Sequence, residues 1–259
     1  MALNLGKIFG IQFRLHFTWF IIFIIVTVSL VSPNYFQWRY WVIGIAASLL
    51  FFASVVAHEL AHSLVGRANG IPVRSLTLFI FGGVAQMTRE VTRPGAEFKM
   101  AIAGPVCSLI IGGLFGMVWL LLDGITDLAM VIFWLAIMNG ALAVFNLLPG
   151  FPLDGGRVLR SLLWHFTGSY RLSTRIATMT GQGVGYSLAL GGILVIFLRP
   201  FGLLWFDGVW FILIGGFLAR LASVSYRQMR WQEAAAQHQA DSTLMPSEYS
   251  IIPRDNIAD

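Results

Sequence analysis

Two histidines and a glutamate lie close together in the first third of the 259-residue chain, in the sequence His58-Glu59-Leu60-Ala61-His62. In a helix, side chains at positions i and i+4 point the same way, so both imidazoles can reach one metal ion. Glu59 would lie about 100° further round the helix, which suits a general base for a water molecule activated by that metal. Such a short pattern also arises by chance, but here it lies in an apolar segment, where three ionisable groups are costly unless they have a function. The pattern therefore predicts a metal site.

A hydrolytic zinc site needs a third protein ligand from another part of the chain. Asp154 is the strongest candidate, because it follows the fourth apolar segment at the same expected membrane depth as His58 and His62. Cys107 is a softer alternative, although a lone cysteine in an apolar run is typical of a small buried residue. The single cysteine also excludes a multi-cysteine metal site. We therefore expect one zinc ion (Zn2+) per chain.

Asp154 belongs to a stretch, residues 146–157, in which the helical pattern is broken. Pro149 and Pro152 interrupt a helix, and two glycines follow the aspartate. Broken backbone at membrane depth is tolerated where it lines a protein-enclosed or water-filled cavity. An ordinary helix end would explain the prolines and glycines, but not Asn146 and Asp154 together. The stretch therefore indicates a cavity with polar groups beside the metal.

The composition is that of a membrane protein. Hydrophobic residues make up 57% of the chain and charged residues 11%, against about 25% charged residues in a soluble domain. A membrane-spanning helix needs about 20 apolar residues, and six segments qualify: 13–31, 41–65, 98–122, 128–148, 181–198 and 203–224. The predicted fold is an all-α membrane protein with six transmembrane helices. Residues 1–226 are expected to form one polytopic membrane domain that carries the metal site, and residues 227–259 a polar, partly mobile cytoplasmic tail.

The basic residues indicate how these spans are oriented. With six spans both termini lie on one side, and of the 17 lysines and arginines only Arg39 and Arg199 fall on the other side. Basic residues concentrate on the cytoplasmic side of membrane proteins. The sequence therefore predicts a multi-pass protein of the cell membrane with both termini in the cytoplasm. The basic residues behind the net charge of +5 cluster at the ends of apolar segments, which is an orientation signal, so no nucleic-acid partner is expected.

Residues 74–93, between the second and third spans, have a different pattern. Two short β-prone runs flank the pair Gly82-Gly83, which predicts a β-hairpin. Each run is too short to cross a bilayer, so the hairpin is expected to be membrane-associated on the cytoplasmic side, within protein or a wet cavity. It could bind an extended substrate as an additional strand, with Gly82, Gly83 and Val84 as candidate substrate-binding residues. The alternative is a purely structural plug.

These features together resemble the site-2 proteases, the intramembrane zinc metalloproteases of regulated intramembrane proteolysis. The matching motifs are His58-Glu59-Leu60-Ala61-His62, Asn146-x-x-Pro149-x-x-Pro152-Leu153-Asp154-Gly155, Phe81-Gly82-Gly83-Val84-Ala85 and Ala103-Gly104-Pro105. The resemblance implies the following roles: zinc ligands His58, His62 and Asp154, catalytic base Glu59, and Asn146 to position the substrate or stabilise the oxyanion. The sequence has no insertion large enough for a PDZ domain, which indicates the compact branch of the family. One departure is Ser108, because the family often has asparagine at this place.

The sequence therefore predicts a zinc metalloendopeptidase that hydrolyses peptide bonds within or near the transmembrane segments of membrane proteins, in contact with the lipid bilayer. A zinc-binding scaffold or transporter is one alternative. Transporters place charges along a path through several helices, whereas these ionisable groups form one cluster. A prenyl-peptide protease is another alternative, and it would need a glutamate ligand on a later helix. Apart from Glu97, at the entry to the third span, no glutamate lies in spans three to six.

Overall fold

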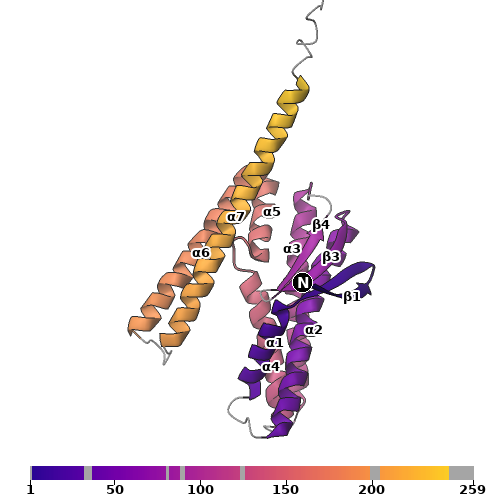
Figure 1. Ribbon diagram of the computed structural model, residues 1–259, viewed down its shortest axis with the longest axis vertical. Helices are drawn as coiled ribbons and strands as arrows, with labels where there is room; N and C mark the ends of the chain where they lie inside the picture. Colours follow the sequence, from indigo (N-terminus) through magenta and orange to yellow (C-terminus); the bar gives the residue numbers. More distant parts are fainter. Residues whose placement is uncertain are drawn as a thin grey trace, which may run out of the picture.

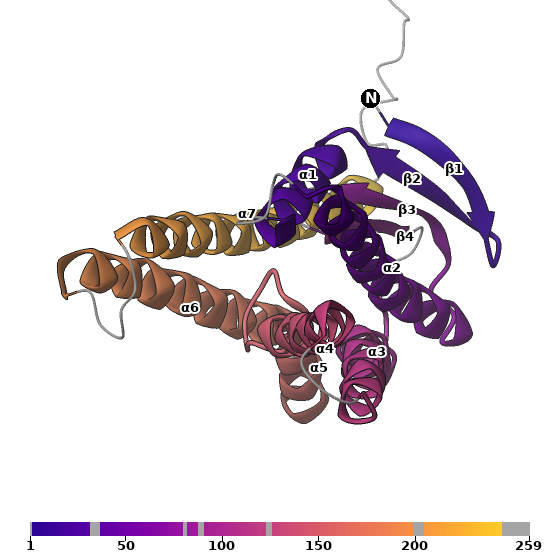
Figure 2. The same cartoon turned by 90° about the horizontal axis from the view of Figure 1, so that it is seen from below.

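The computed structural model describes residues 2–31, 37–79, 82–87, 91–122, 126–198 and 205–244. The elements in chain order are β1 (Ala2–Ile8), β2 (Ile11–His16), α1 (Thr18–Val31), α2 (Trp38–Ala68), β3 (Val73–Phe79), β4 (Gly82–Met87), α3 (Pro94–Leu120), α4 (Asp127–Asn146), α5 (Asp154–Thr167), α6 (Tyr170–Leu198) and α7 (Trp205–Leu244). Helices α1 to α4 form one group, with the strands beside α2, whereas α6 and α7 form an antiparallel pair that leans away from this group (Figure 1). Viewed from below, the strands lie beside α2, with β1 on the outside (Figure 2).

Among the described residues, five helices are long and apolar enough to cross a membrane: α2, α3, α4, α6 and the part of α7 over Trp205–Val224. They match the second to sixth predicted spans. The first predicted span, 13–31, differs, because α1 has only 14 residues. Such a helix is about 21 Å long, against about 30 Å of hydrocarbon. Six complete spans and the cytoplasmic side of the termini therefore stay predictions.

The first predicted span begins as a strand because its side chains alternate. Ile11, Phe13 and Leu15 of β2 are buried, while the polar residues between them are partly exposed. This period of two is typical of a strand with one face against a core. The apolar run of α1 follows directly, so Phe13 and Leu15 look like the start of that helix in the sequence.

The strands form a single sheet in the order β1-β2-β3-β4 within the described ranges. The predicted hairpin is confirmed as the antiparallel pair β3 and β4. Its membership of a larger sheet was not predicted: β2 pairs in parallel with β3, and β1 adds an antiparallel strand outside β2. The all-α description is therefore incomplete. Apolar side chains of β2 and β3 form a buried cluster against α1 and α2, with Trp19, Val56 and Leu60 packed on it. Its members are Ile11, Phe13, Leu15, Val73, Leu76 and Leu78.

Two other differences concern the second half of the chain. Helix α5 lies in the connection between the fourth and fifth predicted spans, where no helix was predicted. The predicted boundary at residue 226 falls inside α7, which continues as one helix to Leu244. Residues 227–244 of the predicted tail are thus helical, and residues 245–259 lie outside the described ranges.

Helices α6 and α7 pack with their backbones in close contact, because glycines face each other across the pair. A Cβ atom on Gly192 of α6 would lie 2.8 Å from the backbone nitrogen of Ile212, and nearer still to the carbonyl oxygen of Gly208. Small residues at such interfaces let membrane helices approach closely. The neighbouring Gly191 has open space at the same position, so only one of these two adjacent glycines is required by packing.

We therefore expect Gly192→Val to separate α6 from α7 and to destabilise the protein by about 1–3 kcal/mol, the usual cost of overpacking. Thermal unfolding in detergent would measure this as a lowered midpoint. Gly191→Val is the matched control and should change the midpoint little. Equal midpoints for the two variants would contradict the backbone contact.

Candidate active site

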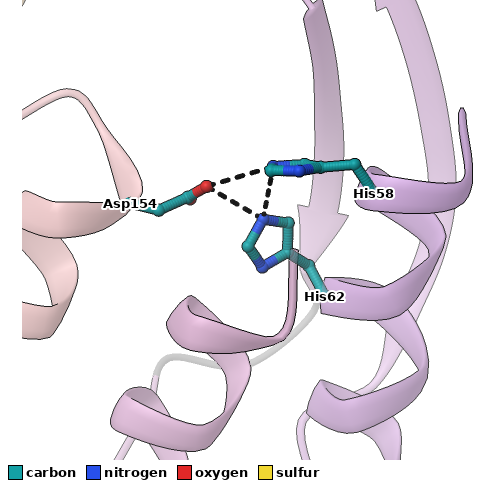
Figure 3. Close-up of side chains that lie close together, drawn as sticks. All are labelled: His58, His62 and Asp154. Atoms are coloured by element: carbon teal, nitrogen blue, oxygen red, sulfur yellow. Dashed lines mark hydrogen bonds and ion pairs between the residues drawn. The ribbon is translucent and has the colours of Figure 1, made fainter. Parts of the chain in front are cut away.

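Three side chains from two distant parts of the chain meet at one point (Figure 3). His58 and His62 project from α2, and Asp154 is the first residue of α5. Asp154 Oδ2 lies 3.2 Å from His58 Nε2 and 3.0 Å from His62 Nε2, and the two Nε2 atoms are 3.2 Å apart. The structure therefore brings together the three residues predicted to bind metal. Cys107, the alternative ligand, is not part of this group.

The broken segment between α4 and α5 carries Asp154 to the histidines. Helix α4 ends at Asn146, and α5 starts eight residues later in the sequence, with its first turn against the backbone of Leu147 and Leu148. A Cβ atom on Gly155 would overlap the carbonyl oxygens of Leu147 and Leu148. A glycine after the aspartate is therefore needed for α5 to begin so close to α4.

The far side of each imidazole is held by α3. His62 Nδ1 lies 2.7 Å from the carbonyl oxygen of Met100, and His58 Nδ1 lies 2.8 Å from the hydroxyl of Ser108. A carbonyl oxygen only accepts, so Nδ1 of His62 is the protonated nitrogen and the neutral ring keeps a lone pair on Nε2. Metal-binding histidines are typically oriented in this way by a partner on the second ring nitrogen. Ser108 and Met100 thus aim both rings at Asp154.

Space for the two rings comes from Gly104 of α3. A Cβ atom at this position would lie 2.6 Å from His58 Nε2 and nearer still to His62 Nε2. Any larger residue would therefore occupy the place where the two ring nitrogens converge. The glycine of the Ala103-Gly104-Pro105 motif has a clear steric role at the site.

The three facing atoms fit a bound cation. Electron-rich atoms 3.0–3.2 Å apart repel one another unless a positive charge lies between them. A tetrahedral zinc ion with bonds of about 2.0–2.1 Å separates its ligand atoms by about 3.3 Å. The donor set and its spacing therefore fit zinc, with one coordination position open.

Glu59 lies beside this cluster and contacts the hairpin. Its Oε1 accepts a hydrogen bond of 3.2 Å from the backbone N–H of Gly83 in β4. A Cβ atom on Gly83 would lie 2.7 Å from the carboxyl carbon of Glu59, so a larger residue would displace this carboxyl group from its present position. Of the other predicted substrate-binding residues, Gly82 pairs with Phe79 and Val84 pairs with Thr77 along β3.

Asn146 and Glu97 lie outside the cluster. The side-chain amide of Asn146 donates a 3.0 Å hydrogen bond to the carbonyl oxygen of Leu142 in its own helix, so its predicted catalytic role stays a prediction. Glu97 is ion-paired with Arg160 and is not a member of the group that could hold a metal. This arrangement speaks against the prenyl-peptide protease alternative, which needs a glutamate ligand.

Two groups of the site were not predicted as such. Ser108 was noted only as a departure from the family pattern, and the sequence gave no indication of the Met100 carbonyl.

Removing the hydroxyl of Ser108 should weaken metal binding, because His58 would lose the partner that orients its ring. We expect Ser108→Ala to raise the zinc dissociation constant by about 10–100-fold, as measured by competition with a chelator. Ser63→Ala is the matched control. Ser63 follows His62 in the sequence, is buried, and its hydroxyl makes no hydrogen bond within the described residues. Unchanged affinity in Ser108→Ala would contradict this role.

Comparison with known proteins shows where the chain belongs. It matches the model of peptidase family M50 over residues 46–126 and 124–191. It is 39% identical to a Synechocystis sp. protein with the provisional name zinc metalloprotease sll0528, over 97% of this chain and 66% of that protein. It is 36% identical to Rip3 of Mycobacterium tuberculosis, also provisionally named a zinc metalloprotease, over 91% of this chain and 61% of that protein. Zinc metalloprotease MJ0392 of Methanocaldococcus jannaschii is 37% identical, over 74% of this chain and 54% of that protein. The chain therefore spans only 54–66% of the length of these relatives.

The fold gives the same result. The structure is similar to the solved site-2 protease from Methanocaldococcus jannaschii, with a TM-score of 0.61 and 32% sequence identity, over 87% of this chain and 95% of that one. The family model, the relatives and the fold agree with the motifs from which the resemblance to site-2 proteases was inferred. The chain belongs to peptidase family M50.

Proposed function

We propose that this chain is an intramembrane zinc metalloprotease that hydrolyses peptide bonds within or near the transmembrane segments of membrane proteins. The observation that carries the proposal is the convergence of His58, His62 and Asp154 on one point. The two histidines and the neighbouring Glu59 belong to α2, a helix long and apolar enough to cross a membrane. Membership of peptidase family M50 supports the same reaction class.

The chemistry follows from where each side chain lies. Zinc bound by the three ligands would supply a Lewis acid that polarises the scissile carbonyl group and makes water more acidic. Glu59 takes the proton of the attacking water and passes it to the leaving amine. The hydrogen bond from Gly83 keeps the Glu59 carboxylate turned toward the hairpin, where the substrate would lie. Asn146 would add a hydrogen bond to the developing oxyanion after releasing the carbonyl of its own helix.

The substrate would bind along β4. This strand lies at one end of the described sheet and contacts Glu59 through the N–H of Gly83. A transmembrane helix hides its peptide bonds, so the substrate must unwind before cleavage. An unwound segment can add to a sheet edge as a further strand, which satisfies its backbone groups at membrane depth. The scissile bond would then lie between β4 and the metal ligands.

We also infer that the site opens toward the cytoplasm. His62 lies six residues before the end of α2, about 9 Å along the helix axis. Water therefore needs to cross only the outer part of the bilayer from that end. The excess of basic residues on the side that holds both termini supports a cytoplasmic assignment.

Replacing the proposed base should separate catalysis from metal binding. We expect Glu59→Gln to lower the cleavage rate of single-span model substrates in proteoliposomes by about 10²–10⁴-fold, because the amide cannot accept the proton of water. Zinc content should equal that of the unaltered protein. His58→Ala is the comparison variant, which should lose zinc as well as cleavage. Cleavage at the normal rate by Glu59→Gln would remove the proposed mechanism.

Blocking the edge of β4 should impair substrate binding without affecting the metal. Because Gly83 directs its N–H away from β3, alternation along the strand directs the N–H of Ala85 to the same edge. Ala85→Pro removes this donor, and we expect cleavage of membrane-spanning substrates to fall about tenfold, which corresponds to one lost hydrogen bond of about 1.4 kcal/mol. Ala85→Ser retains the N–H and should cleave normally. Equal rates for the two variants, with equal zinc content, would instead favour a structural plug.

A further inference from the structure

Arg160 of α5 is enclosed by groups from three other parts of the chain. Its guanidinium carbon lies 4.8 Å from the ring centre of Phe151 and 4.8 Å from that of Tyr170. Its Nε donates a 2.9 Å hydrogen bond to Glu97 Oε1, its Nη2 contacts the same oxygen, and its Nη1 lies 2.9 Å from the hydroxyl of Tyr170. The Glu97 side chain is fully buried and that of Arg160 is 14% exposed.

A buried ion pair of this kind contributes little net stability, because both charges lose their hydration. Its value lies in geometry: the planar guanidinium has fixed directions for its donors and can be held between two rings. Glu97 is in the first turn of α3, Phe151 precedes α5, and Tyr170 begins α6. Arg160 therefore fixes the position of α5 relative to these three segments.

This position matters for the metal site because α5 begins with Asp154. Arg160 lies six positions after Asp154 in the same helix, about 9 Å along its axis. The two histidines are held by the same helix that carries Glu97, through Met100 and Ser108. Helix α3 thus contacts both parts of the metal site. It holds the two histidines directly, and the contact of Arg160 with Glu97 is a polar link between α3 and the helix that carries Asp154.

We propose that Arg160 and Glu97 are positioning residues for the metal site, which hold Asp154 at binding distance from His58 and His62. The proposal rests on the zinc-binding role of Asp154 within the proposed function. Neither residue touches the metal ligands in any hydrogen bond of the described residues, so both act through the placement of α5.

The test measures zinc affinity of the full chain in nanodiscs by chelator competition, together with the visible absorption of the cobalt-substituted protein. Arg160→Gln should weaken zinc binding about tenfold, the lower range for residues that orient metal ligands, and should alter the cobalt spectrum because the carboxylate is displaced. Arg160→Lys keeps the charge but not the planar fork, so it should restore only part of the affinity. Glu97→Gln gives the same test if Arg160→Gln does not fold.

Two controls separate positioning from general stability. Thr27→Val removes a buried 2.9 Å hydrogen bond between α1 and α2, from Thr27 to Ser48, and should lower the unfolding temperature without changing zinc affinity. In a background that carries Asp154→Ala, Arg160→Gln should cause no further loss of affinity, because the ligand it positions is already absent.

Zinc affinity equal to that of the unaltered protein in both Arg160→Gln and Glu97→Gln would overturn the proposal. The same loss of affinity with and without Asp154→Ala would overturn it as well. Failure of the proposed function would look different: the unaltered protein would then bind zinc without cleaving substrate, or would not bind zinc.

Discussion

The mutual repulsion of the metal ligands is the constraint on which the site depends. Two imidazole nitrogens and a carboxylate oxygen lie 3.0–3.2 Å apart in a largely buried site, where water screens them only weakly. Without a cation, such atoms would move apart if their side chains were free to do so. The protein must therefore hold each side chain in place. A hydrogen bond on the second ring nitrogen holds each imidazole, and the position of α5 holds Asp154.

Most of this support comes from one face of α3. Glu97, Met100, Gly104 and Ser108 follow one another at intervals of three and four residues, which places them on the same side of the helix. Two of them hold the imidazoles, one leaves room for the rings, and Glu97 binds the helix that carries Asp154. A single rigid helix thus sets the relative positions of groups that are about one hundred residues apart in the sequence.

Local spacing explains what the sequence could predict. The i, i+4 spacing of His58 and His62 fixes their convergence once a helix is assumed, and Asp154 was identified because a charge is rare beside an apolar span. The partner of Arg160 lies 63 residues away and has no local pattern, so the pair was not found. The Met100 carbonyl is a backbone group that every residue type has, so the sequence could not identify it as the partner of His62. Strand β2 was missed because six alternating residues run directly into the apolar helix α1.

The place of Glu59 between metal and sheet follows from the period of α2. Val56 and Leu60, one turn apart, pack against the buried face of the sheet, while His58 and His62, also one turn apart, face α3. At about 100° per residue, Glu59 lies on the side of the helix between these two rows. It can therefore contact β4 and the metal ligands at once, as its hydrogen bond from Gly83 indicates. Because the sheet is packed on the same turns that carry the histidines, a substrate strand added to β4 would have its register set relative to the metal by the helix itself.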